Sequence, residues 1–454
     1  MLNFNKHINQ VKKGGVKVII KKLRSLIYLI LQIPIYLISI PLIITLHLIK
    51  PWYLIRWQEL VSSRIGHFST ETELNCCERD AGINSPPQKC LNLFYMGKYI
   101  CNKQLEKMWR RSLIVLPAWL LRPLNRVGRF FCLFISSFKE HEIVVSYRAF
   151  DIHNLIDKFP AHISFTDKEE LKGKEILKKF GLGKDAKFVC LHVRDAGYLN
   201  RHIKHEYKDR WQYHNYRNGN IDNYVLAAEE LARRGYYVFR MGKNVLKPLK
   251  SSNPKVIDYA SSKMRNDFMD IYLSAKCNFF ISPGSGLDGV AVIFQRPIAF
   301  IGHVPFGNFA LFGKSKKETL LLAKHHINKK NQKKLTISEI FSANVAFAYT
   351  SDEYKLNDVE LEENSPEEIR DLVIEMDERL NGRWRDAKED LSLQKRFWSI
   401  FEDEIIRLNI KKPIHELKYF NMRQKITYNS EIFKGKIKLR YGAKFLRENQ
   451  NWTR

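Results

Sequence analysis

The amino-acid sequence predicts an α/β protein built on a parallel sheet that helices cover on both faces. Three observations predict this fold class. Apolar runs of strand length alternate with helical patterns, glycines follow the helices, and residues 188–242 read strand, loop, helix, strand. Strands joined through a helix run parallel, and the crossover between them is right-handed. We therefore expect successive strands to end at the same edge of one sheet.

The central unit opens with the apolar run 188–191, which continues directly into His-Val-Arg-Asp. A helical pattern follows over 222–234, with Asp222 as the expected N-cap and Gly235 as the expected C-cap. The second strand-like run, 236–239, ends in Arg-Met-Gly. We expect the two strands to be neighbours in the sheet.

Both strands of this unit stop at an arginine, Arg194 after the first and Arg240 after the second. Open α/β sheets bind their ligands at the carboxyl edge of the strands. A guanidinium can pair with two phosphate oxygens at once, because its donors form a planar fork. The pair of arginines therefore favours an anionic ligand that carries phosphate.

The alternation of strands and helices continues beyond Gly242. The expected elements are a strand at 256–259, a helix at 267–276, a strand at 277–281, a helix at 287–294 and a strand at 297–301. After Gly302 the pattern loosens, and the basic stretch 313–334 reads as a surface segment. A helix is expected at 366–380, after an acidic turn.

The chain has 454 residues and a formal charge of +28, from 76 Lys and Arg against 48 Asp and Glu. Such a balance favours nucleic acid, an anionic membrane face or anionic substrates as partners. No recognised nucleic-acid motif occurs, so the membrane is favoured. The seven cysteines are odd in number and include no C-x-x-C pair, which argues against a zinc site and for a reducing compartment.

Residues 25–49 carry no formal charge and are long enough to span about 30 Å of hydrocarbon. Basic residues before this segment favour a cytoplasmic N-terminus with the rest of the chain sent across. Pro34 and Pro41 lie inside it, and each can kink a helix. We expect a kinked segment that enters and leaves the same face and holds both basic flanks against anionic lipid. A true crossing is the rival interpretation.

Four segments follow from these patterns. Residues 1–56 form a basic flank and a membrane segment, and residues 57–180 form a first α/β domain. Residues 181–410 form a second α/β domain around the central unit, and residues 411–454 form a basic tail. The catalytic body is expected at the cytoplasmic face of the cell inner membrane.

A glycine-rich turn at 282–286 joins an expected strand to an expected helix. Gly284 and Gly286 would let backbone amides near Ser285 face a ligand, and the start of the helix adds partial positive charge. A tight turn without a ligand is the alternative. The turn matches neither G-x-G-x-x-G nor G-x-x-x-x-G-K-[ST], so the dinucleotide and P-loop interpretations lose support.

Short motifs in a fixed order resemble a bacterial family of glycosyltransferases associated with surface-polysaccharide synthesis. The sequence His-Val-Arg-Asp at 192–195 resembles the His-x-Arg motif of fucosyltransferase-like enzymes with the GT-B architecture. The other matching pieces are 64–67, 216–218, 240–242, 267–272, 285–286, 296–297 and 363–365.

The resemblance implies two Rossmann-like domains, the first binding an acceptor and the second a nucleotide-sugar donor. It implies that Arg194 holds the donor diphosphate. Asp195 stands where fucosyltransferases often carry a second arginine, and this departure argues against GDP-fucose as the donor.

Sugar transfer from a nucleotide builds negative charge on the departing phosphate, which cations and amides stabilise. A base must also take the proton of the acceptor hydroxyl, and the two candidates are Asp195 and His67. No Asp-x-Asp motif ends a strand, so we expect a metal-independent reaction without a cofactor. The expected donor-binding residues are His192, Arg194, Arg217, Arg240, Gly242, Gly284, Ser285, Gly286, Glu363, Asn364 and Ser365.

Structural roles remain open for several of these residues. Asp195 suits a salt bridge or a loop cap, and His67 suits a hydrogen-bonded turn. His192 suits the end of a strand, and residues 363–365 suit the cap of the helix that follows them.

The predicted function is transfer of a sugar from a nucleotide-sugar donor to a glycan or polyprenyl-linked acceptor in bacterial surface-polysaccharide synthesis. The alternative is a non-catalytic, membrane-associated glycan-binding or scaffold protein with the same fold. Nucleic acid is the least favoured partner.

Overall fold

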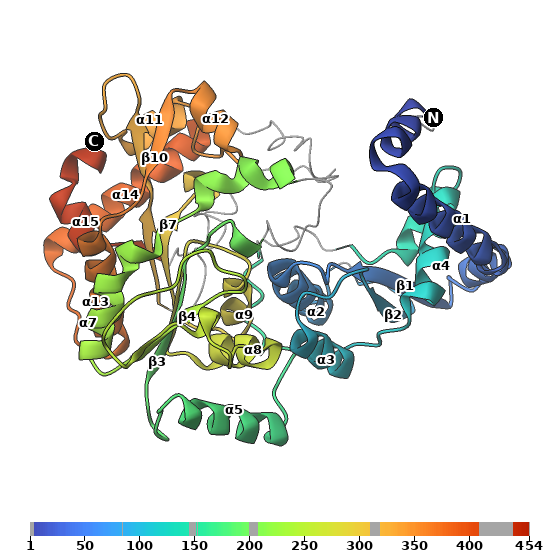
Figure 1. Cartoon of the computed structure of the whole chain (residues 1–454), viewed down its shortest axis with the longest axis horizontal. Helices are drawn as coiled ribbons and strands as arrows, with labels where there is room; N and C mark the ends of the chain where they lie inside the picture. The colour runs from blue at the N-terminus through green and yellow to red at the C-terminus, as the bar shows by residue number, and fades with distance from the viewer. Residues whose placement is uncertain are drawn as a thin grey trace. The chain divides into compact units, whose positions relative to one another are not determined.

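A computed structural model describes residues 4–83, 85–144, 151, 153–198, 208–308, 318–407 and 439–453. The chain forms two compact units, each assembled from separate stretches of sequence (Figure 1). Unit 1 comprises Met1–Val61, Asn84–Tyr99 and Leu113–Val144, and unit 2 comprises Ser62–Ile83, Ile100–Ser112 and Val145–Arg454.

Unit 1 holds a small parallel sheet and two longer helices. Strands β1 (Tyr53–Leu60) and β2 (Lys89–Met96) pair in parallel along their whole length. Helices α1 (Phe4–Leu48) and α4 (Ala118–Phe131) pack beside each other, and the short helix η2 (Ser136–His141) follows. The core of the unit is apolar and contains Ile43, Trp57, Tyr95, Leu121, Leu124, Val127 and Phe138.

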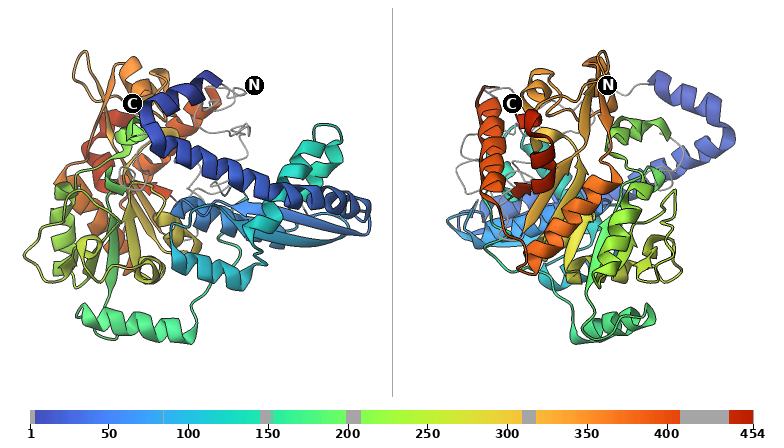
Figure 2. Two further views of the ribbon diagram at one scale, coloured as in Figure 1. Left: turned by 45° about the vertical axis from the view of Figure 1, so that its right-hand side comes forward. Right: turned by 90° about the vertical axis from the view of Figure 1, so that its left-hand side faces the viewer.

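Helix α1 is interrupted near its start, where Gly15 takes a φ of 54° that breaks the helical path (Figure 2). Pro34 and Pro41 lie within the longer part that follows. Among the residues that the structure describes, no helix is both long enough and apolar enough to cross a membrane.

Unit 2 is organised around a seven-stranded sheet in the order β11-β8-β7-β6-β3-β4-β5, and every pair in it is parallel. Strands β3, β6, β7 and β8 are buried along nearly their whole length, as expected where helices cover both faces of a sheet. Helices α7 and α13 lie on one side of the sheet, while α8 and α9 lie on the other (Figure 1). The predicted α/β class and the large parallel sheet are confirmed.

The strands of unit 2 are β3 (Phe188–His192), β4 (Tyr237–Met241), β5 (Val256–Ile257), β6 (Phe279–Ser282), β7 (Ile298–His303), β8 (Thr319–Ala323), β9 (His325–Asn328), β10 (Val359–Glu362) and β11 (Leu439–Tyr441). Its α-helices are α2 (Thr72–Asp80), α3 (Lys103–Ser112), α5 (Asp167–Lys179), α7 (Val225–Arg233), α8 (Asp267–Lys276), α9 (Asp288–Ile293), α11 (Ile337–Ser342), α12 (Ser351–Leu356), α13 (Pro366–Leu380), α14 (Lys388–Arg407) and α15 (Ala443–Glu448). Its shorter helices are η1 (His67–Glu71), η3 (Lys208–Arg217), η4 (Ile221–Tyr224), η5 (Tyr259–Ser261), η6 (Phe306–Asn308) and η8 (Gln450–Thr453).

The central unit of the sequence forms as predicted, with one difference at its helix. Strands β3 and β4 are parallel neighbours, and Gly235 closes α7 with a φ of 99°. Asn220 caps the short 3₁₀ helix η4 that precedes α7, and its side chain accepts from the Asp222 amide at 3.2 Å. Helix α7 itself begins after Tyr224, which makes no side-chain cap. The predicted cap at Asp222 is therefore wrong, because Asp222 lies inside η4.

Two stretches that the sequence analysis placed outside the core belong to the sheet. The basic stretch 313–334 contains β8 and β9, and β8 is buried throughout. The last part of the predicted basic tail forms β11, which pairs in parallel with β8. Residues 408–438 of that tail lie outside the described residues. Lysines surrounding short apolar runs concealed these strands in the sequence.

Candidate functional site

The sheet of unit 2 changes its direction of winding between β3 and β6. The chain adds β4 and β5 on one side of β3, and then returns to add β6, β7 and β8 on the other side. Ligands of open α/β sheets bind beyond the carboxyl ends of the strands at such a switch point. Arg194 follows β3, and the glycine turn at 283–287 follows β6. The structure therefore brings two of the predicted groups to this place.

Two arginines lie close together at the switch point. Arg194 donates through Nη1 to the carbonyl oxygen of His214 at 3.0 Å and to Asn218 Oδ1. Arg217 donates to the carbonyl oxygen of Gly284 in the turn after β6. Burial lowers the pKa of Arg194 to about 10, and the Arg217 charge contributes to this lowering. Both guanidiniums thus share one positive region.

A buried lysine joins the same region from the end of β8. Lys324 is only 6% exposed, and its Nζ donates to the carbonyl oxygen of Asn218. Burial lowers the pKa of Lys324, while the Glu363 carboxylate raises it and Arg194 lowers it further. Glu363 accepts the Asn220 amide with both carboxylate oxygens, at 3.0 and 2.8 Å, so it braces the loop as well as facing the lysine.

His214 reports the positive potential of this region. Its pKa is lowered to about 3, first by burial and then by the charges of Arg217, Arg194 and Arg64. We refer to Arg64, Arg194, Arg217 and Lys324 as the cationic cluster. Like charges at close range are costly unless an anion joins them, so the cluster is suited to a ligand with more than one negative charge.

The turn after β6 is shaped for close packing. Gly284 has a φ of +82°, and a Cβ there would lie 2.4 Å from His303 Nδ1. Ser282 Oγ accepts from the amides of Gly284 at 3.2 Å and Ser285 at 3.4 Å, and it donates to Asp288 Oδ2 at 2.7 Å. These amides bond within the chain, although the sequence analysis expected them to face a ligand. The side chains of the cationic cluster, and not these amides, are therefore the groups that would bind an anion.

Packing of glycine on glycine brings His67 beside this turn. A Cβ on Gly66 would lie 2.8 Å from Gly286 Cα, so the two backbones touch directly. His67 follows Gly66, and its Nδ1 donates to Glu71 Oε1 at 2.6 Å. Glu71 is 7% exposed and lies one helical turn further on. The pair leaves His67 Nε2 as the ring atom that can accept a proton.

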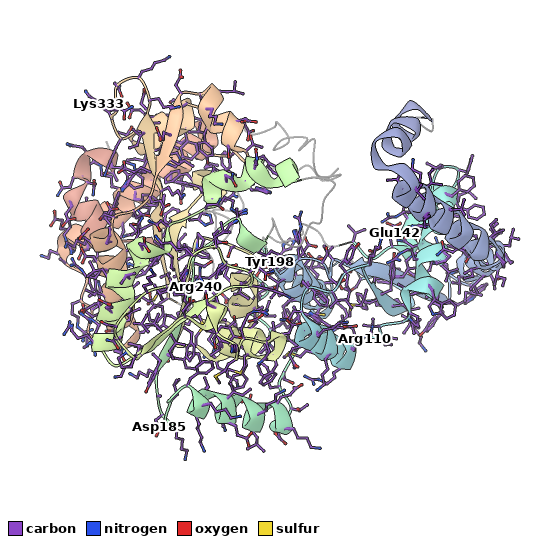
Figure 3. All side chains as sticks on the ribbon, viewed as in Figure 1. Arg110, Glu142, Asp185, Tyr198, Arg240 and Lys333 are labelled. Carbon is purple, nitrogen blue, oxygen red and sulfur yellow. The ribbon has the colours of Figure 1, made fainter. Side chains whose placement is uncertain are left out.

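Asp195 and Arg240 form an ion pair near the ends of β3 and β4, and the Asp195 carboxylate also raises the pKa of Arg194, against the burial that lowers it. Asp195 accepts the amides of Gly197 and Leu246, each at 2.8 Å, so both of its oxygens hold loops in place. Arg240 is the last residue but one of β4 and is only 1% exposed (Figure 3). It pairs with Asp258 at 3.4 Å and Asp195 at 3.8 Å, which balances its charge.

The remaining predicted donor-binding residues have structural contacts. His192 donates to the carbonyl oxygen of Met241 at 3.3 Å, and its pKa is lowered to about 4, mainly by burial. Gly242 has a φ of +149°, and a Cβ there would lie 2.7 Å from Val245 Cγ1. The charge of Arg194 also lowers the pKa of His192, so His192 lies within electrostatic reach of the cationic cluster, whereas Gly242 packs against Val245.

The stretch 363–365 links the cluster to a helix. Ser365 caps α13 in a reciprocal arrangement with Glu368, which is the role that the alternative interpretation gave it. Asn364 is 2% exposed and donates to the carbonyl oxygen of Ala323 at 2.9 Å, so it fixes the end of β8 directly before Lys324.

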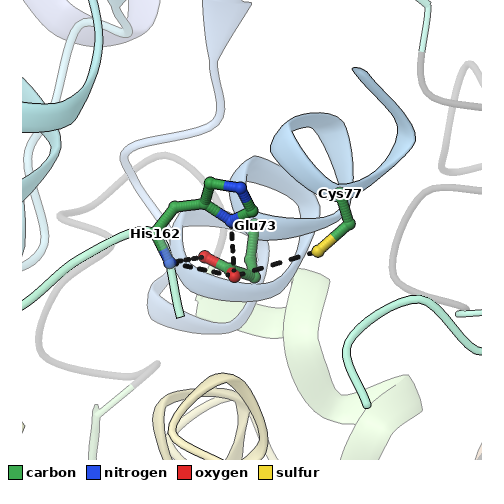
Figure 4. A group of neighbouring side chains, drawn as sticks. All are labelled: Glu73, Cys77 and His162. Atoms are coloured by element: carbon green, nitrogen blue, oxygen red, sulfur yellow. Dashed lines mark hydrogen bonds and ion pairs between the residues drawn. The ribbon is translucent and has the colours of Figure 1, made fainter. Parts of the chain in front are cut away.

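One group of side chains has the donor types of a metal site. Ligand atoms of Glu73, Cys77 and His162 lie within 4.8 Å of one another (Figure 4). However, His162 Nδ1 donates to Glu73 at 2.8 Å and Nε2 donates to Asp80 at 2.8 Å, so both ring nitrogens are engaged by carboxylates. Burial is the main cause that raises the pKa of the Cys77 thiol, and the Glu73 carboxylate raises it further. Through these ion pairs, His162 holds the segment before α5 against α2.

Sequence reasoning missed Lys324, His214, Glu71 and the part that Arg64 plays. Lys324 could have been found by the rule that pointed to Arg194, since it directly follows a buried parallel strand. Glu71 is four residues after His67 and therefore lies on the same helical face. His214 gave no comparable signal.

No protein-family model and no curated protein matches the chain. Among solved structures, a glycosyl transferase family 9 protein from Veillonella parvula DSM 2008 is similar, with 12% identity, a TM-score of 0.35, and coverage of 60% of this chain and 86% of that one. The E. coli ADP-heptose LPS heptosyltransferase II is also similar, with 13% identity, a TM-score of 0.30, and coverage of 54% and 83%.

Proposed function

We propose that the protein is a GT-B-like glycosyltransferase that takes a sugar from a nucleotide-sugar donor. The observation that carries this proposal is the cationic cluster at the switch point of the sheet. Arg194, Arg217 and Lys324 are drawn together there although burial lowers the pKa of Arg194 and of Lys324. A diphosphate would relieve their mutual repulsion and accept bidentate hydrogen bonds from the guanidiniums.

In the proposed reaction, the cluster holds the diphosphate of the donor. The bond between the anomeric carbon and the phosphate oxygen breaks, and its electron pair leaves with the nucleoside diphosphate. The cations stabilise the negative charge that develops on this leaving group. No metal ion or cofactor is required in this scheme, because side chains supply the positive charge.

His67 is proposed as the base, and Asp195 is not. His67 Nε2 takes the proton from the acceptor hydroxyl while the acceptor oxygen bonds to the anomeric carbon, and Glu71 holds the ring through Nδ1. Asp195 is occupied by two backbone amides and by Arg240, which suits the loop-cap alternative. We propose that Arg240 does not contact the donor. It pairs with Asp195 and so helps to hold the loops that Asp195 binds.

The finer parts of the proposal concern the acceptor and the setting. We propose a glycan or polyprenyl-linked acceptor in bacterial surface-polysaccharide synthesis, with the catalytic body on the cytoplasmic face of the cell inner membrane. The net charge of +28 supports a setting against anionic lipid. A non-catalytic scaffold or glycan-binding protein with this fold is the alternative.

Nucleoside diphosphate binding tests the proposal. ADP, GDP, UDP and TDP are titrated against the full chain by calorimetry, and at least one is expected to bind. Arg194→Ala should abolish that binding, whereas Arg233→Ala, at an arginine paired with Glu230 on the surface of α7, should keep it. If none of the four binds, the proposal fails.

Hydrolysis of the matching nucleotide sugar without an acceptor then separates an enzyme from a scaffold. Slow release of free sugar that depends on Arg194 is expected from a transferase. Binding without any hydrolysis, and without transfer to a detergent-solubilised lipid acceptor, would favour the scaffold.

A further inference from the structure

Helix α1 presents apolar side chains on the side that unit 1 does not cover. Its packed side includes Ile43, which is buried against α4 and β1. The other side leaves large apolar side chains exposed: Ile33, Leu37, Ile38, Ile40, Leu42, Ile44 and Leu48. A helix that is apolar all round belongs in a protein interior or in lipid. Only part of α1 has a protein interior beside it.

A second apolar segment of unit 1 is exposed where α4 ends. Leu133 is 75% exposed, Phe134 is 72% exposed, and Phe130 and Ile135 are exposed as well. Phe130 and Phe134 contact each other edge to face, with ring centroids 5.5 Å apart. These side chains therefore form one apolar projection, which we call the 130–135 knob.

Aromatic stacking places the knob near the end of α1. His47 stacks on Phe138 with ring centroids 3.8 Å apart, and Phe138 stacks on Phe131 at 5.1 Å. Leu48 follows His47, while Phe131 lies next to Phe130 in the sequence. The exposed end of α1 and the knob thus belong to one end of unit 1.

Exposed apolar side chains are concentrated in unit 1. Within the described residues, all but five of the exposed large apolar side chains belong to it, and those five are Leu171, Leu246, Leu356, Leu391 and Ile406. Soluble proteins rarely leave such a large apolar surface open. Two exposed tryptophans, Trp52 and Trp119, belong to the same unit, and tryptophan favours the boundary between lipid and water.

The charge of unit 1 identifies the kind of surface that it fits. Its stretches contain 15 Lys and Arg against three acidic residues, Glu59, Glu140 and Glu142. Apolar side chains beside an excess of basic ones match a bilayer with anionic headgroups, because the bilayer offers hydrocarbon below a negative surface. A protein partner would have to supply both features at once.

We propose that unit 1 docks in the plane of an anionic bilayer, with the exposed side of α1 and the 130–135 knob inserted together at its surface. The inference deepens the membrane setting proposed above by naming the inserted residues. Its test uses no substrate, so failure of docking and failure of glycosyl transfer are separate results.

Flotation of the full chain with vesicles tests the proposal. Vesicles of phosphatidylglycerol and phosphatidylethanolamine are compared with vesicles of phosphatidylcholine alone. The wild-type chain should float with the anionic vesicles. Phe130→Ser/Leu133→Ser/Phe134→Ser should lower its partition coefficient at least about tenfold, since each side chain loses lipid burial. Leu37→Ser/Leu48→Ser should act in the same direction.

The matched control is Leu171→Ser/Leu356→Ser/Leu391→Ser, which removes exposed leucines from unit 2 instead. It should bind vesicles as the wild type does. All these positions are exposed, so the variants are expected to fold, which circular dichroism checks. Equal binding by wild type and knob variant would overturn the proposal. A second result would also overturn it: the wild type forms a stable dimer that does not bind vesicles, and the knob variant is a monomer. The apolar surface would then bind a second copy of the chain.

Discussion

His67 Nδ1 lies 2.6 Å from Glu71 Oε1, one helical turn away on η1. This contact fixes the imidazole with Nε2 available, beside the turn where Gly66 touches Gly286. A carboxylate that holds a histidine in one tautomer is a recurring arrangement for proton transfer. Glu71 is only 7% exposed, so its carboxylate is buried beside the ring that it holds.

His67→Gln should lower kcat about 10²–10⁴-fold, because the reaction then lacks its base. Glu71→Gln should lower kcat by a smaller factor, because the ring remains but is no longer held in one orientation. KM for the donor should change little in either variant. Steady-state kinetics with the donor found by the binding test measures both effects.

The control for this pair is His153→Gln, which changes an exposed histidine of the same unit. Its kinetics should match those of the wild type. A normal kcat in the His67→Gln enzyme would show that His67 is not the base, and it would favour Asp195, the other candidate.

Lys324→Met should separate ligand binding from stability. Burial and Arg194 disfavour the charge of Lys324, so its removal should leave the free energy of unfolding unchanged or higher, although the residue is buried. Donor affinity should fall at least about tenfold, since a contact to phosphate is lost. Urea unfolding and calorimetry measure the two quantities on the same protein.

Lys324 would be a structural residue if its replacement gave the opposite pattern. A loss of more than about 2 kcal/mol in stability, together with unchanged donor affinity, would remove it from the cationic cluster. Lys187→Met gives a comparison at a lysine that donates to Asn381 Oδ1 at 2.9 Å and lies directly before β3.

Local sequence patterns predicted the sheet better than the site. The strands at 188–192 and 237–241 could be predicted because apolar runs, a helix and Gly235 follow one another in order. Arg194 could be placed at the edge for the same reason. The role of Arg240 could not, since nothing local shows that Asp258 would pair with it inside the strand.

Contacts between distant segments account for most of what the sequence did not reveal. Lys324 joins the cluster because β8 lies in the same sheet as β3, and the basic residues around β8 resembled a surface segment. The approach of Gly66 to Gly286 brings together residues far apart in the chain, and no spacing rule predicts it. The glycine turn was predicted correctly as a turn, whereas the direction of its amides depends on Ser282 and Asp288.

Gly66→Ala should reduce activity more than it reduces stability. Its Cβ would lie 2.8 Å from Gly286 Cα, so the segment that carries His67 must move away from the turn. We expect kcat to fall at least about tenfold, because a displacement on the order of 1 Å is enough to misplace a catalytic group. Gly183→Ala is the matched control, since a Cβ there has no atom within 4 Å. Equal activity of the two variants would contradict the close approach.

His162→Gln should destabilise the protein in a manner that depends on pH. Burial alone would lower the pKa of His162, but its bonds to Glu73 and Asp80 outweigh burial and raise the pKa above 6.5. A raised pKa in the folded state means that protonation favours folding. This stabilisation is complete below about pH 6.5 and is lost as pH rises through the raised pKa.

The gap in free energy of unfolding between wild type and His162→Gln should therefore be at least about 1 kcal/mol in mildly acidic solution, and it should narrow in alkaline solution. Urea unfolding at a series of pH values measures it. His153→Gln should show no such gap, because that residue is exposed. A gap that stays constant with pH would mean that His162 contributes through packing alone. A gap that widens with pH would mean that neutral His162, and not the imidazolium, holds α2 to the segment before α5.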